Sequence, residues 1–416
     1  MSCERTIEIT DGVYWTGTLN PLLRVFDIIM KTEYGTSYNS YIVKGSSKIA
    51  LIDGGHEKFT DLFLEKVSGI IEGDFTKIDY VVVNHTEPDH AGNLFKLMEL
   101  NPEIKIVCTV PAKKFLEQIS NRSFNFIQAS DELKIDLGGK TLEFLLSPFW
   151  HWPDTMFTYL KEDKILFPCD GFGAHFSDER MFVDLLDEDS YKKYLQAMQY
   201  YYVHIMGPFK EHTRNTLEKL DRYDIKTIAP SHGPIHTGEF VKKHTDLYRQ
   251  WAKKDVHKKN RILLLYVSAY GYTRKLAMSI AKGIENAGGE VQLFDLVNDV
   301  NAENKLDILV NKQEWADGIL YGSPTINGDA LLNIWEAIGL LALVDGKKEK
   351  SYSAFGSYGW SGEAVPFLFN RLSAMKFDVF SSENPLRIRF KPTEKDLETA
   401  EQFGRSFLEH IRGMEK

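Results

Sequence analysis

Residues 80–90 read Tyr-Val-Val-Val-Asn-His-Thr-Glu-Pro-Asp-His, a run that passes from an apolar strand into the start signal of a helix. We expect the strand to be buried and the first helical turn to begin near Ala91. Upstream, the apolar runs 40–43 and 49–52 flank a short glycine-and-serine connection, which predicts an antiparallel hairpin. Residues 63–71 have helical periodicity. This part of the chain is therefore predicted to be mixed α and β.

Four metal-ligating residue types lie together in that run. His85, Glu87 and Asp89 alternate, so their side chains can point the same way, and His90 follows on the turn. Clustered imidazole and carboxylate groups suit a first-row transition metal. The alternative is that Asp89 caps the helix and the histidines are surface polar groups. The joint occurrence of all four favours the metal site.

Three more potential ligands each follow an apolar run: His151, Asp170 and His232. Taken alone, each of them could be an ordinary turn residue. Because loops at strand ends assemble sites, the three complete a set of seven with the first cluster. His175 and His236 lie a few residues beyond Asp170 and His232, and they are candidates for hydrogen-bond donors behind the ligands or for residues that line the pocket.

The other histidines are expected to be surface or structural residues. The three cysteines form no Cys-x-x-Cys pair, so neither a disulfide framework nor a cysteine-held metal centre is predicted. Cys169 should face the opposite side of its strand from Asp170 and serve the core. The histidines expected to be surface or structural residues are His56, His204, His212, His244, His257 and His410.

The best domain boundary is the charged stretch 251–261, which contains four lysines. After it, apolar β-rich runs alternate with helical patterns, which is typical of a parallel sheet with crossover helices. We therefore predict a doubly wound second domain. In the helix after the first strand, Thr273 is placed to cap the start and Gly288 to end it. The predicted strands are 262–267, 291–296, 318–321 and 353–355.

Three loops of the second domain follow parallel strands and should meet at one crevice. The first loop puts hydroxyls and free backbone N–H groups at a helix start, which is an anion site. It matches neither the GxGxxG nor the Walker pattern, so a dinucleotide or a nucleoside triphosphate is not the expected guest. Trp360 in the third loop is a candidate for stacking on a planar ligand. Tyr266 and Phe355 are expected to be core residues. The three loops lie within 268–273, 321–328 and 355–363.

The spacing His85-x-Glu87-x-Asp89-His90, followed by separate His, Asp and His residues, resembles the flavodiiron proteins. These join a metallo-β-lactamase-like αββα domain, here 1–252, to a flavodoxin-like domain, here 261–416. The usual lactamase motif has histidine where Glu87 stands. By resemblance, one iron is held by His85, Glu87 and His151, the other by Asp89, His90 and His232, and Asp170 bridges them.

The resemblance also implies FMN in the second domain. It implies phosphate contacts from Ser268, Tyr270, Gly271 and Thr273, although Tyr270 departs from the threonine that is common in flavodoxins. Thr325, Asn327, Tyr358, Gly359 and Trp360 would lie near the isoalloxazine ring. The same three loops supply the other expected FMN contacts, Ala269, Tyr272, Ser323, Pro324, Ile326, Ser357, Ser361 and Gly362.

The resemblance implies an enzyme that reduces dioxygen to water, nitric oxide to nitrous oxide, or both, with the choice left open. It implies a head-to-tail homodimer or a dimer of dimers, and a separate electron donor that is a rubredoxin-like protein or a reduced soluble cofactor. One alternative is a zinc hydrolase of the lactamase fold with an accessory flavodoxin-like domain, which Glu87 disfavours. Another is an electron carrier that uses FMN alone.

Composition limits the partners. Fifty basic and 59 acidic residues among 416 give a formal charge of −9, which repels a phosphate backbone and disfavours nucleic acid. The longest apolar run, 337–344, is far short of the ~20 residues that cross a bilayer. The first residues lack the apolar segment of a secretory signal. We therefore expect a cytoplasmic protein without a membrane span.

Overall fold

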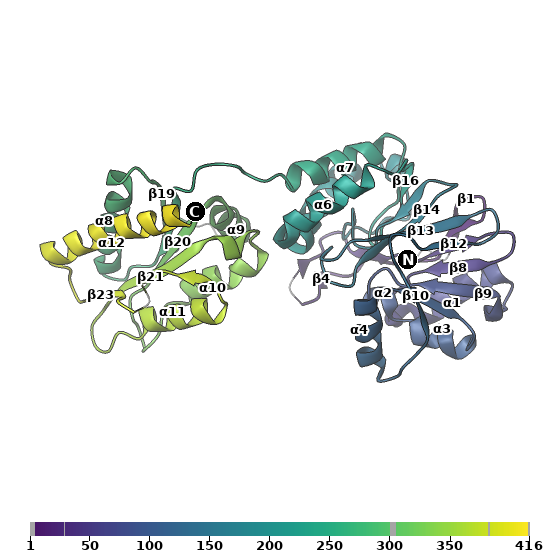
Figure 1. Ribbon diagram of the computed structural model, residues 1–416, viewed down its shortest axis with the longest axis horizontal. Coiled ribbons are helices and arrows are strands. Elements are labelled where there is room, and N and C mark those ends of the chain that lie inside the picture. Colours follow the sequence, from purple (N-terminus) through teal and green to yellow (C-terminus); the bar gives the residue numbers. More distant parts are fainter. Residues whose placement is uncertain (1–4, 29, 300–304, 382, 415–416) are drawn as a thin grey trace. The chain divides into compact units, whose positions relative to one another are not determined.

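The computed structural model of the protein describes residues 5–28, 30–299, 305–381 and 383–414, so Cys3 lies outside the described residues. The chain divides into two units, Met1–Lys254 and Asp255–Lys416 (Figure 1).

Two sheets form the centre of the first unit. The first sheet has the strand order β1-β2-β7-β8-β9-β10-β11, and the second runs in sequence order from β12 to β17. The predicted hairpin is confirmed, because β7 pairs antiparallel with β8. The strands of the first sheet are β1 (Ile7–Thr10), β2 (Val13–Trp15), β7 (Tyr41–Lys44), β8 (Ile49–Ile52), β9 (Ile78–Val82), β10 (Lys105–Cys108) and β11 (Phe126–Gln128). Those of the second are β12 (Lys134–Asp136), β13 (Thr141–Leu146), β14 (Met156–Leu160), β15 (Ile165–Phe167), β16 (Thr227–Ile228) and β17 (His236–Thr237).

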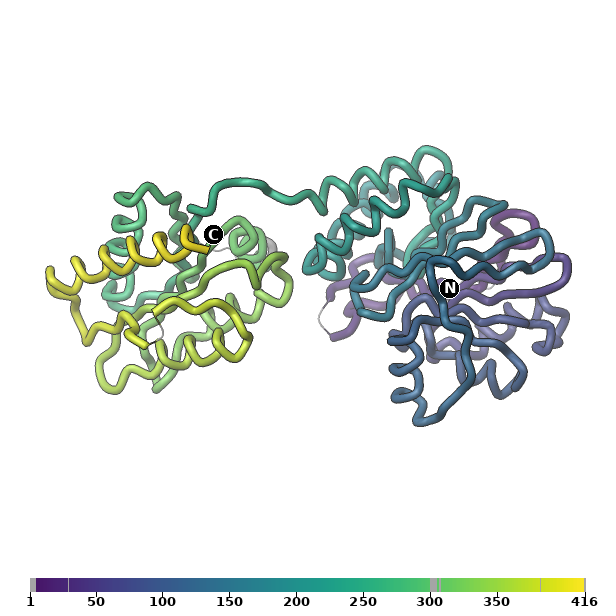
Figure 2. Tube along the Cα trace, viewed as in Figure 1, coloured from purple at the N-terminus to yellow at the C-terminus, as the bar shows by residue number. Residues whose placement is uncertain are grey.

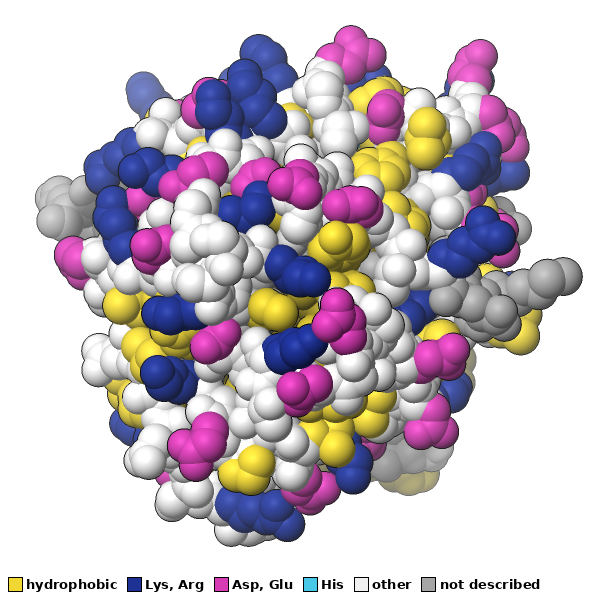
Figure 3. Space-filling view, turned by 90° about the vertical axis from the view of Figure 1, so that its right-hand side faces the viewer, with side chains coloured by type: hydrophobic (Ala, Val, Ile, Leu, Met, Phe, Trp, Pro, Cys, Tyr) yellow, Lys and Arg dark blue, Asp and Glu magenta, His cyan; other side chains and the backbone are white. Residues whose placement is uncertain are grey.

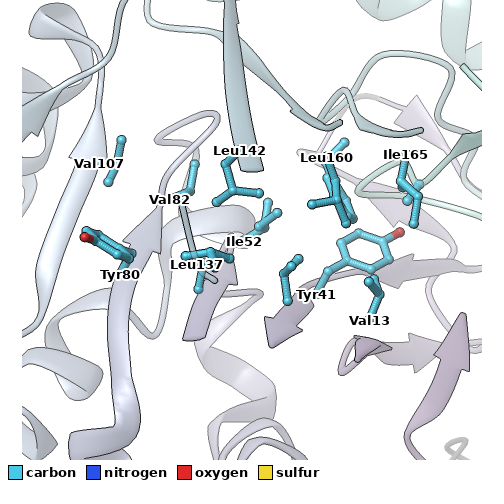
Figure 4. Packing of buried hydrophobic residues seen from close by; sticks show 14 of the residues in the cluster. Val13, Tyr41, Ile52, Tyr80, Val82, Val107, Leu137, Leu142, Leu160 and Ile165 are labelled. Atoms are coloured by element: carbon cyan, nitrogen blue, oxygen red, sulfur yellow. The ribbon is translucent and has the colours of Figure 1, made fainter. Parts of the chain in front are cut away.

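The inner faces of these sheets pack against each other. Side chains from both sheets, Ile52 and Val82 from one and Leu142 and Leu160 from the other, lie together in Figure 4, and all four are fully buried. Each buried aliphatic side chain of this kind contributes about 1.5–3 kcal/mol of transfer free energy. This inter-sheet core fixes the strand ends that carry the site.

Helices cover the outer faces and complete the predicted αββα sandwich. On the first sheet, Val67 of α1, Leu97 of α3 and Leu116 of α4 are buried in one apolar cluster with strand residues. On the second sheet, Met198 of α5 and Tyr248 of α7 are buried in another. The helices of this unit are α1 (Thr60–Ile71), α2 (Pro88–Ala91), α3 (Leu94–Leu100), α4 (Val110–Ser120), α5 (Glu188–Tyr201), α6 (Lys210–Leu220) and α7 (Glu239–Trp251).

The first unit also contains four short strands and a π-helical turn. β3 pairs antiparallel with β6, and β4 pairs antiparallel with β5. The π-helical turn follows α5 directly. The bounds are β3 (Thr18–Asn20), β4 (Val25–Phe26), β5 (Met30–Lys31), β6 (Thr36–Tyr38) and the turn Tyr202–Met206.

The second unit is the predicted doubly wound parallel sheet. Its strand order is β19-β18-β20-β21-β22, with β23 paired to the end of β21, and every pair is parallel. The strands are β18 (Arg261–Tyr266), β19 (Glu290–Asp295), β20 (Gly318–Gly322), β21 (Ser351–Tyr358), β22 (Asp378–Val379) and β23 (Leu386–Arg389). The helices are α8 (Tyr272–Asn286), α9 (Lys305–Trp315), α10 (Leu332–Gly339), α11 (Ala364–Ala374) and α12 (Glu394–Gly413).

Alternate residues of β18 explain why its sequence is apolar without a break. Ile262 and Leu264 face a cluster with α8 and α12, whereas Leu263 and Leu265 face a cluster with α9, α10 and α11. A parallel strand that is covered on both faces must be apolar on both. The predicted core positions of Tyr266 and Phe355 are confirmed, because they are 4% and 0% exposed.

Two helices on one face of this sheet approach closely. Figure 2 shows the C-terminal helix α12, in yellow, alongside α8. A Cβ atom on Gly283 would lie 1.9 Å from the carbonyl oxygen of Glu401, so a side chain there would push the helices apart. This packing holds α8, whose N-terminus bears the first of the three predicted ligand loops.

Candidate metal centre and flavin site

The first site lies where strand ends of both sheets meet. Residue 85 follows β9, and β15 and β16 precede Asp170 and His232. The helix predicted to begin near Ala91 begins instead at Pro88, so Asp89 and His90 lie within its first turn. Proline is favoured at this position, because the N–H that it lacks has no partner in a first turn. Asp89 does not cap the helix, because Glu87 is the N-cap residue.

The seven predicted ligands converge into two adjacent groups. One group holds His85, Glu87, His151 and Asp170, and the other holds Asp89, His90 and His232, with the potential ligand atoms of each group within 4.8 Å of one another.

In the first group, Nε2 of His85 and of His151 lie 3.1 and 3.2 Å from Oε2 of Glu87. In the second, Nε2 of His232 lies 3.2 Å from Oδ2 of Asp89, and Nε2 of His90 lies 3.4 Å from its Oδ1.

Asp170 faces both groups, with one oxygen toward each. Its Oδ2 lies 3.3 Å from Nε2 of His151 and 3.8 Å from Nε2 of His85. Its Oδ1 lies 3.2 Å from Nε2 of His90 and 3.4 Å from Nε2 of His232. A carboxylate placed in this way can bridge two cations.

Unpaired buried atoms show that these residues fit metal ions. Both carboxylate oxygens of Asp89, Oδ2 of Asp170 and Nε2 of His90 are buried, and none of them has a hydrogen-bond partner among the described residues. Leaving ionised oxygens buried and unpaired is costly. One cation in each group would satisfy all of these atoms at once.

The electrostatics of the cluster also favour cations. Burial opposes protonation of His85, but hydrogen bonds with Asp154 and Glu87 outweigh it and raise the pKa of His85 to about 10. Burial likewise opposes protonation of His90, and the charges of Asp170 and Asp89 raise its pKa well above the ordinary value. The same negative potential attracts a metal ion in place of these protons.

Cys169 departs from its predicted place. Its Sγ lies in one group with ligand atoms of His90 and Asp170, so it does not point away from the cluster. The prediction assumed strand alternation, but β15 ends at Phe167 and Cys169 sits in a turn with φ of +50°. The thiol is buried, and desolvation raises its pKa well above the ordinary value.

The two histidines predicted near the ligands have different places. His175 lies against the cluster: its ring centroid is 5.2 Å from that of His232, and its Nδ1 is 3.0 Å from the Thr36 hydroxyl. The hydrogen bonds of His236 lead away from the ligands, to the Tyr194 hydroxyl at 2.7 Å and to Nδ1 of His244 at 3.3 Å.

The other six histidines stand apart from the two ligand groups. His244 is buried and has the structural place that was predicted. Nε2 of His257 lies 3.1 Å from a carboxylate oxygen of Asp317, and Nε2 of His410 lies 2.7 Å from one of Asp378, both in the second unit. His56 contacts Tyr38, His204 contacts Tyr200, and His212 contacts Phe149.

Two residues of this site, Asp154 and Tyr201, were not predicted from the sequence. Asp154 contacts Nδ1 of His85, and the Tyr201 hydroxyl donates to Asp170. Asp27 lies beside Glu87, and burial together with that carboxylate raises the pKa of Asp27 to about 7. The one signal for Asp154 is its place in the Trp-Pro-Asp run after His151. No sequence pattern points to Tyr201.

The second site is a cavity of about 380 Å³ in the second unit. All three predicted loops line it, from the ends of β18, β20 and β21. The predicted lining residues are Ala269, Tyr270, Tyr272, Pro324, Thr325, Ile326, Asn327, Ser357, Tyr358, Gly359, Trp360 and Ser361. Gly328 and Phe390 also line the cavity, and they were not predicted. Trp360 is 91% exposed, which leaves its ring free to cover a planar ligand.

Five predicted residues lie outside the cavity lining: Ser268, Gly271, Thr273, Ser323 and Gly362. The prediction that Thr273 caps α8 is wrong. The N-cap is Gly271 with φ of +77°, and the Ser268 hydroxyl accepts the N–H of Arg274. The buried Thr273 hydroxyl is instead 2.9 Å from the Ser357 hydroxyl, so it links the first loop to the third.

Helix length and surface charge limit which partners the protein can bind. No helix among the described residues is long and apolar enough to cross a membrane. On the face seen in Figure 3, basic and acidic side chains are interspersed. That face therefore offers no large field of one sign to a charged partner.

Known proteins resemble both units. The family model described as ODP family beta lactamase matches residues 36–233, and the flavodoxin model matches residues 264–404. The flavo-diiron protein FprA2 of Clostridium acetobutylicum is 42% identical over 97% of this chain and 99% of its own length. The nitric oxide reductase of Moorella thermoacetica is 34% identical over 97% and 98%. The structure of rubredoxin oxygen:oxidoreductase from Desulfovibrio gigas matches with a TM-score of 0.68 and 26% identity, over 99% of each chain.

Proposed function

The chain belongs to the flavodiiron protein family, and from this premise we propose which of its residues bind the irons and the flavin of a diiron oxidoreductase. FMN belongs to its flavodoxin-like unit and the non-haem diiron centre to its β-lactamase-like unit. The reaction is the reduction of dioxygen, nitric oxide or both, with electrons from a redox partner. We propose residues 1–252 and 261–416 as the two domains, which the division of the chain after Lys254 supports.

One observation carries the assignment of the irons: each oxygen of Asp170 faces a different group of ligand atoms. We propose that Asp170 bridges two irons, one of which is held by His85, Glu87 and His151. The other is held by Asp89, His90 and His232. The unpaired oxygens of Asp89 and Asp170 support this arrangement.

The donor set suits iron better than zinc. Three carboxylates against two ferrous ions leave one positive charge, which a bridging hydroxide would cancel, and carboxylates stabilise the ferric state. A mostly imidazole set would favour zinc instead. Glu87, in the place where lactamases carry histidine, provides the third carboxylate.

When bound, the two groups would supply four electrons, two from reduced FMN and two from the ferrous irons. Four electrons with four protons convert dioxygen to two waters, whereas two electrons with two protons convert two nitric oxides to nitrous oxide and one water. The chain contributes position and charge. The Tyr201 hydroxyl orients Asp170. Phe26 and Tyr38 pack on His232 and restrict access of water to its ring.

We propose that FMN occupies the cavity lined by the three loops, with its phosphate at the N-terminus of α8. There Gly271 is the N-cap, Thr273 lies in the first turn, and the Ser268 hydroxyl of the preceding loop accepts the N–H of Arg274. The helix dipole favours an anion at this end. The ring would lie against Trp360, Tyr358 and Thr325. The apolar character of the cavity and the exposure of Trp360 support this pose.

We propose a head-to-tail homodimer or a dimer of dimers, so that the flavin of one chain meets the irons of another. Two exposed apolar surfaces support this proposal. The hollow around His151 is lined by Phe149, Trp152 and Phe209, and the flavin cavity is bordered by Trp360 and Tyr270. Sedimentation velocity of the holoenzyme tests it, because a monomer at working concentrations would contradict it.

We propose that the donor is a separate rubredoxin-like protein or a reduced soluble cofactor. The Desulfovibrio gigas protein is named for rubredoxin. Stopped-flow reduction of the flavin by candidate donors would identify it. A cytoplasmic location also stays a proposal from the sequence, and fractionation of the source cells would test it.

Metal analysis, an absorption spectrum and anaerobic turnover with each gas test the proposed function. We expect about two irons and one FMN per chain and consumption of dioxygen, nitric oxide or both. Zinc without gas consumption would support a hydrolase, and flavin without metal would support an electron carrier. Either result would overturn the proposal.

A further inference from the structure

The imidazole of His85 is held from both sides. Its Nε2 faces the ligand group, whereas its Nδ1 lies 3.1 and 3.2 Å from the two carboxylate oxygens of Asp154. Both side chains are fully buried. The Trp152 ring meets the imidazole edge-on, with the centroids 4.9 Å apart, and limits its rotation. Asp154 is therefore the polar partner of the nitrogen that points away from the ligand group.

Asp154 is itself fixed by two threonines. The backbone N–H and the hydroxyl of Thr86 each donate to its Oδ2 at 2.8 Å. The hydroxyl of Thr109 donates to its backbone carbonyl at 2.9 Å. A side chain anchored in this way cannot follow a moving imidazole. It sets the orientation of His85 rather than adapting to it.

The other ligand histidines lack this partner. Nδ1 of His232 lies 2.6 Å from the backbone carbonyl of Ser37, a neutral acceptor. In the ion pairs of the described residues, neither His90 nor His151 faces a carboxylate through Nδ1. The two proposed iron positions thus differ in the hydrogen-bond partners of the histidine nitrogens that point away from the ligand groups. The difference is a carboxylate within hydrogen-bond distance of Nδ1, which His85 has in Asp154.

We propose that Asp154 is a positioning residue that holds the Nδ1–H tautomer of His85 and strengthens iron binding at the position formed by His85, Glu87 and His151. A carboxylate behind a ligating histidine fixes its tautomer and raises its basicity, and loss of such a partner costs about 10–100-fold in metal affinity. The second position, formed by Asp89, His90 and His232, keeps its affinity. This inference rests on the proposed diiron function.

The test is release of iron from the full-length holoenzyme to a chelator, followed by metal analysis. We expect one iron of Asp154→Asn to be released about 10–100-fold faster than in the wild type, and the other iron to be released at its wild-type rate. Asp154→Ala, which removes the acceptor altogether, should release that iron faster still. The flavin absorbance should not change, which reports an intact second unit.

A double-mutant cycle separates positioning from a general loss of structure. If Asp154 acts through His85, Asp154→Asn should change nothing further in the His85→Ala background. Equal effects of Asp154→Asn in both backgrounds would overturn the inference. So would an unchanged release rate in a folded Asp154→Asn protein, or faster release of both irons alike.

A milder variant covers the case in which the Asp154 variants do not fold. Thr86→Val removes one hydroxyl donor to Asp154 and keeps the backbone donor. We expect faster release of the same single iron, by a smaller factor, and an unchanged rate would overturn the inference. Failure of the proposed function is seen separately, because the wild type would then hold no iron.

Discussion

The Tyr201 hydroxyl donates a hydrogen bond of 2.7 Å to Oδ1 of Asp170, the oxygen that faces His90 and His232. Tyr201 is the last residue of α5, and the π-helical turn that begins at Tyr202 follows it directly. Burial, reinforced by the charge of Asp170, raises the pKa of Tyr201 well above its ordinary value. The phenol therefore remains a donor across the whole working pH range, and it fixes one of the two oxygens proposed to bridge the irons.

Tyr201→Phe should weaken iron binding about tenfold or more while the fold and the FMN content remain. The variant removes one donor and leaves Oδ1 of Asp170 free to turn, and outer hydrogen bonds of this kind support metal affinity. Iron titration of the metal-free protein measures the effect.

Tyr194→Phe is the matched control for Tyr201→Phe. Tyr194 is a buried tyrosine on the same helix, and its hydroxyl bonds His236 instead of a proposed ligand. It should leave iron affinity unchanged. Equal losses in the two variants would mean that Tyr201 acts only through stability.

Asp170→Ala should lose iron and gas reduction and keep FMN. The variant removes the carboxylate whose two oxygens face the four ligand imidazoles. It therefore removes the group that is proposed to bridge the two irons. Metal analysis and the flavin spectrum of one sample give both readouts. Asp163→Ala is the control, because Asp163 pairs with Lys140 at a distance from the cluster. Full activity of Asp170→Ala would refute the bridging role.

Periodicity predicted a doubly wound second unit and a mixed α and β first unit, whereas the αββα arrangement of the first unit was implied by the family resemblance. The unbroken apolar strand β18 requires cover on both faces, and the hairpin of β7 and β8 requires only a short turn between apolar runs. The seven proposed ligands were predictable for a related reason. Each one follows an apolar run, and strand ends collect at the edges of sheets.

Contacts between side chains that are distant in sequence were not predictable. Asp154 reaches His85 across 69 positions, and Tyr201 reaches Asp170 across 31, so no local pattern joins them. The error over Cys169 arose because a strand was assumed to continue where a turn with positive φ begins. The error over Thr273 arose because a hydroxyl at a helix start was taken for a cap, whereas it reaches Ser357 across 84 positions.

Trp360→Ala should weaken FMN binding without loss of stability. The side chain is 91% exposed, so its removal uncovers little, whereas stacking of aromatic faces contributes about 0.5–1.5 kcal/mol beyond area burial. The dissociation constant of FMN should rise about 2–10-fold. The iron content should stay near that of the wild type. Flavin fluorescence titration measures it. Leu332→Ala, another exposed apolar residue of this unit, should have no effect.

His244 makes the first unit sensitive to acid. It lies in a buried chain of hydrogen bonds, 3.1 Å from the Tyr191 hydroxyl and 3.3 Å from His236. Burial, with the nearby charge of Lys243, lowers the pKa of His244 to about 3. The imidazole of the native chain thus stays neutral at pH values where that of the unfolded chain takes up a proton.

His244→Gln should reduce the loss of stability on acidification. In the wild type, the unfolded state binds more protons between pH 6.5 and about pH 3, so the free energy of unfolding falls as the pH falls through this window. At pH 5 this one group accounts for about 2 kcal/mol relative to pH 8. Glutamine keeps a polar side chain and cannot titrate, so the difference between the two pH values should shrink by about that amount in denaturant titrations that follow the first unit. An identical pH dependence in the two proteins would mean that His244 is protonated in the native chain.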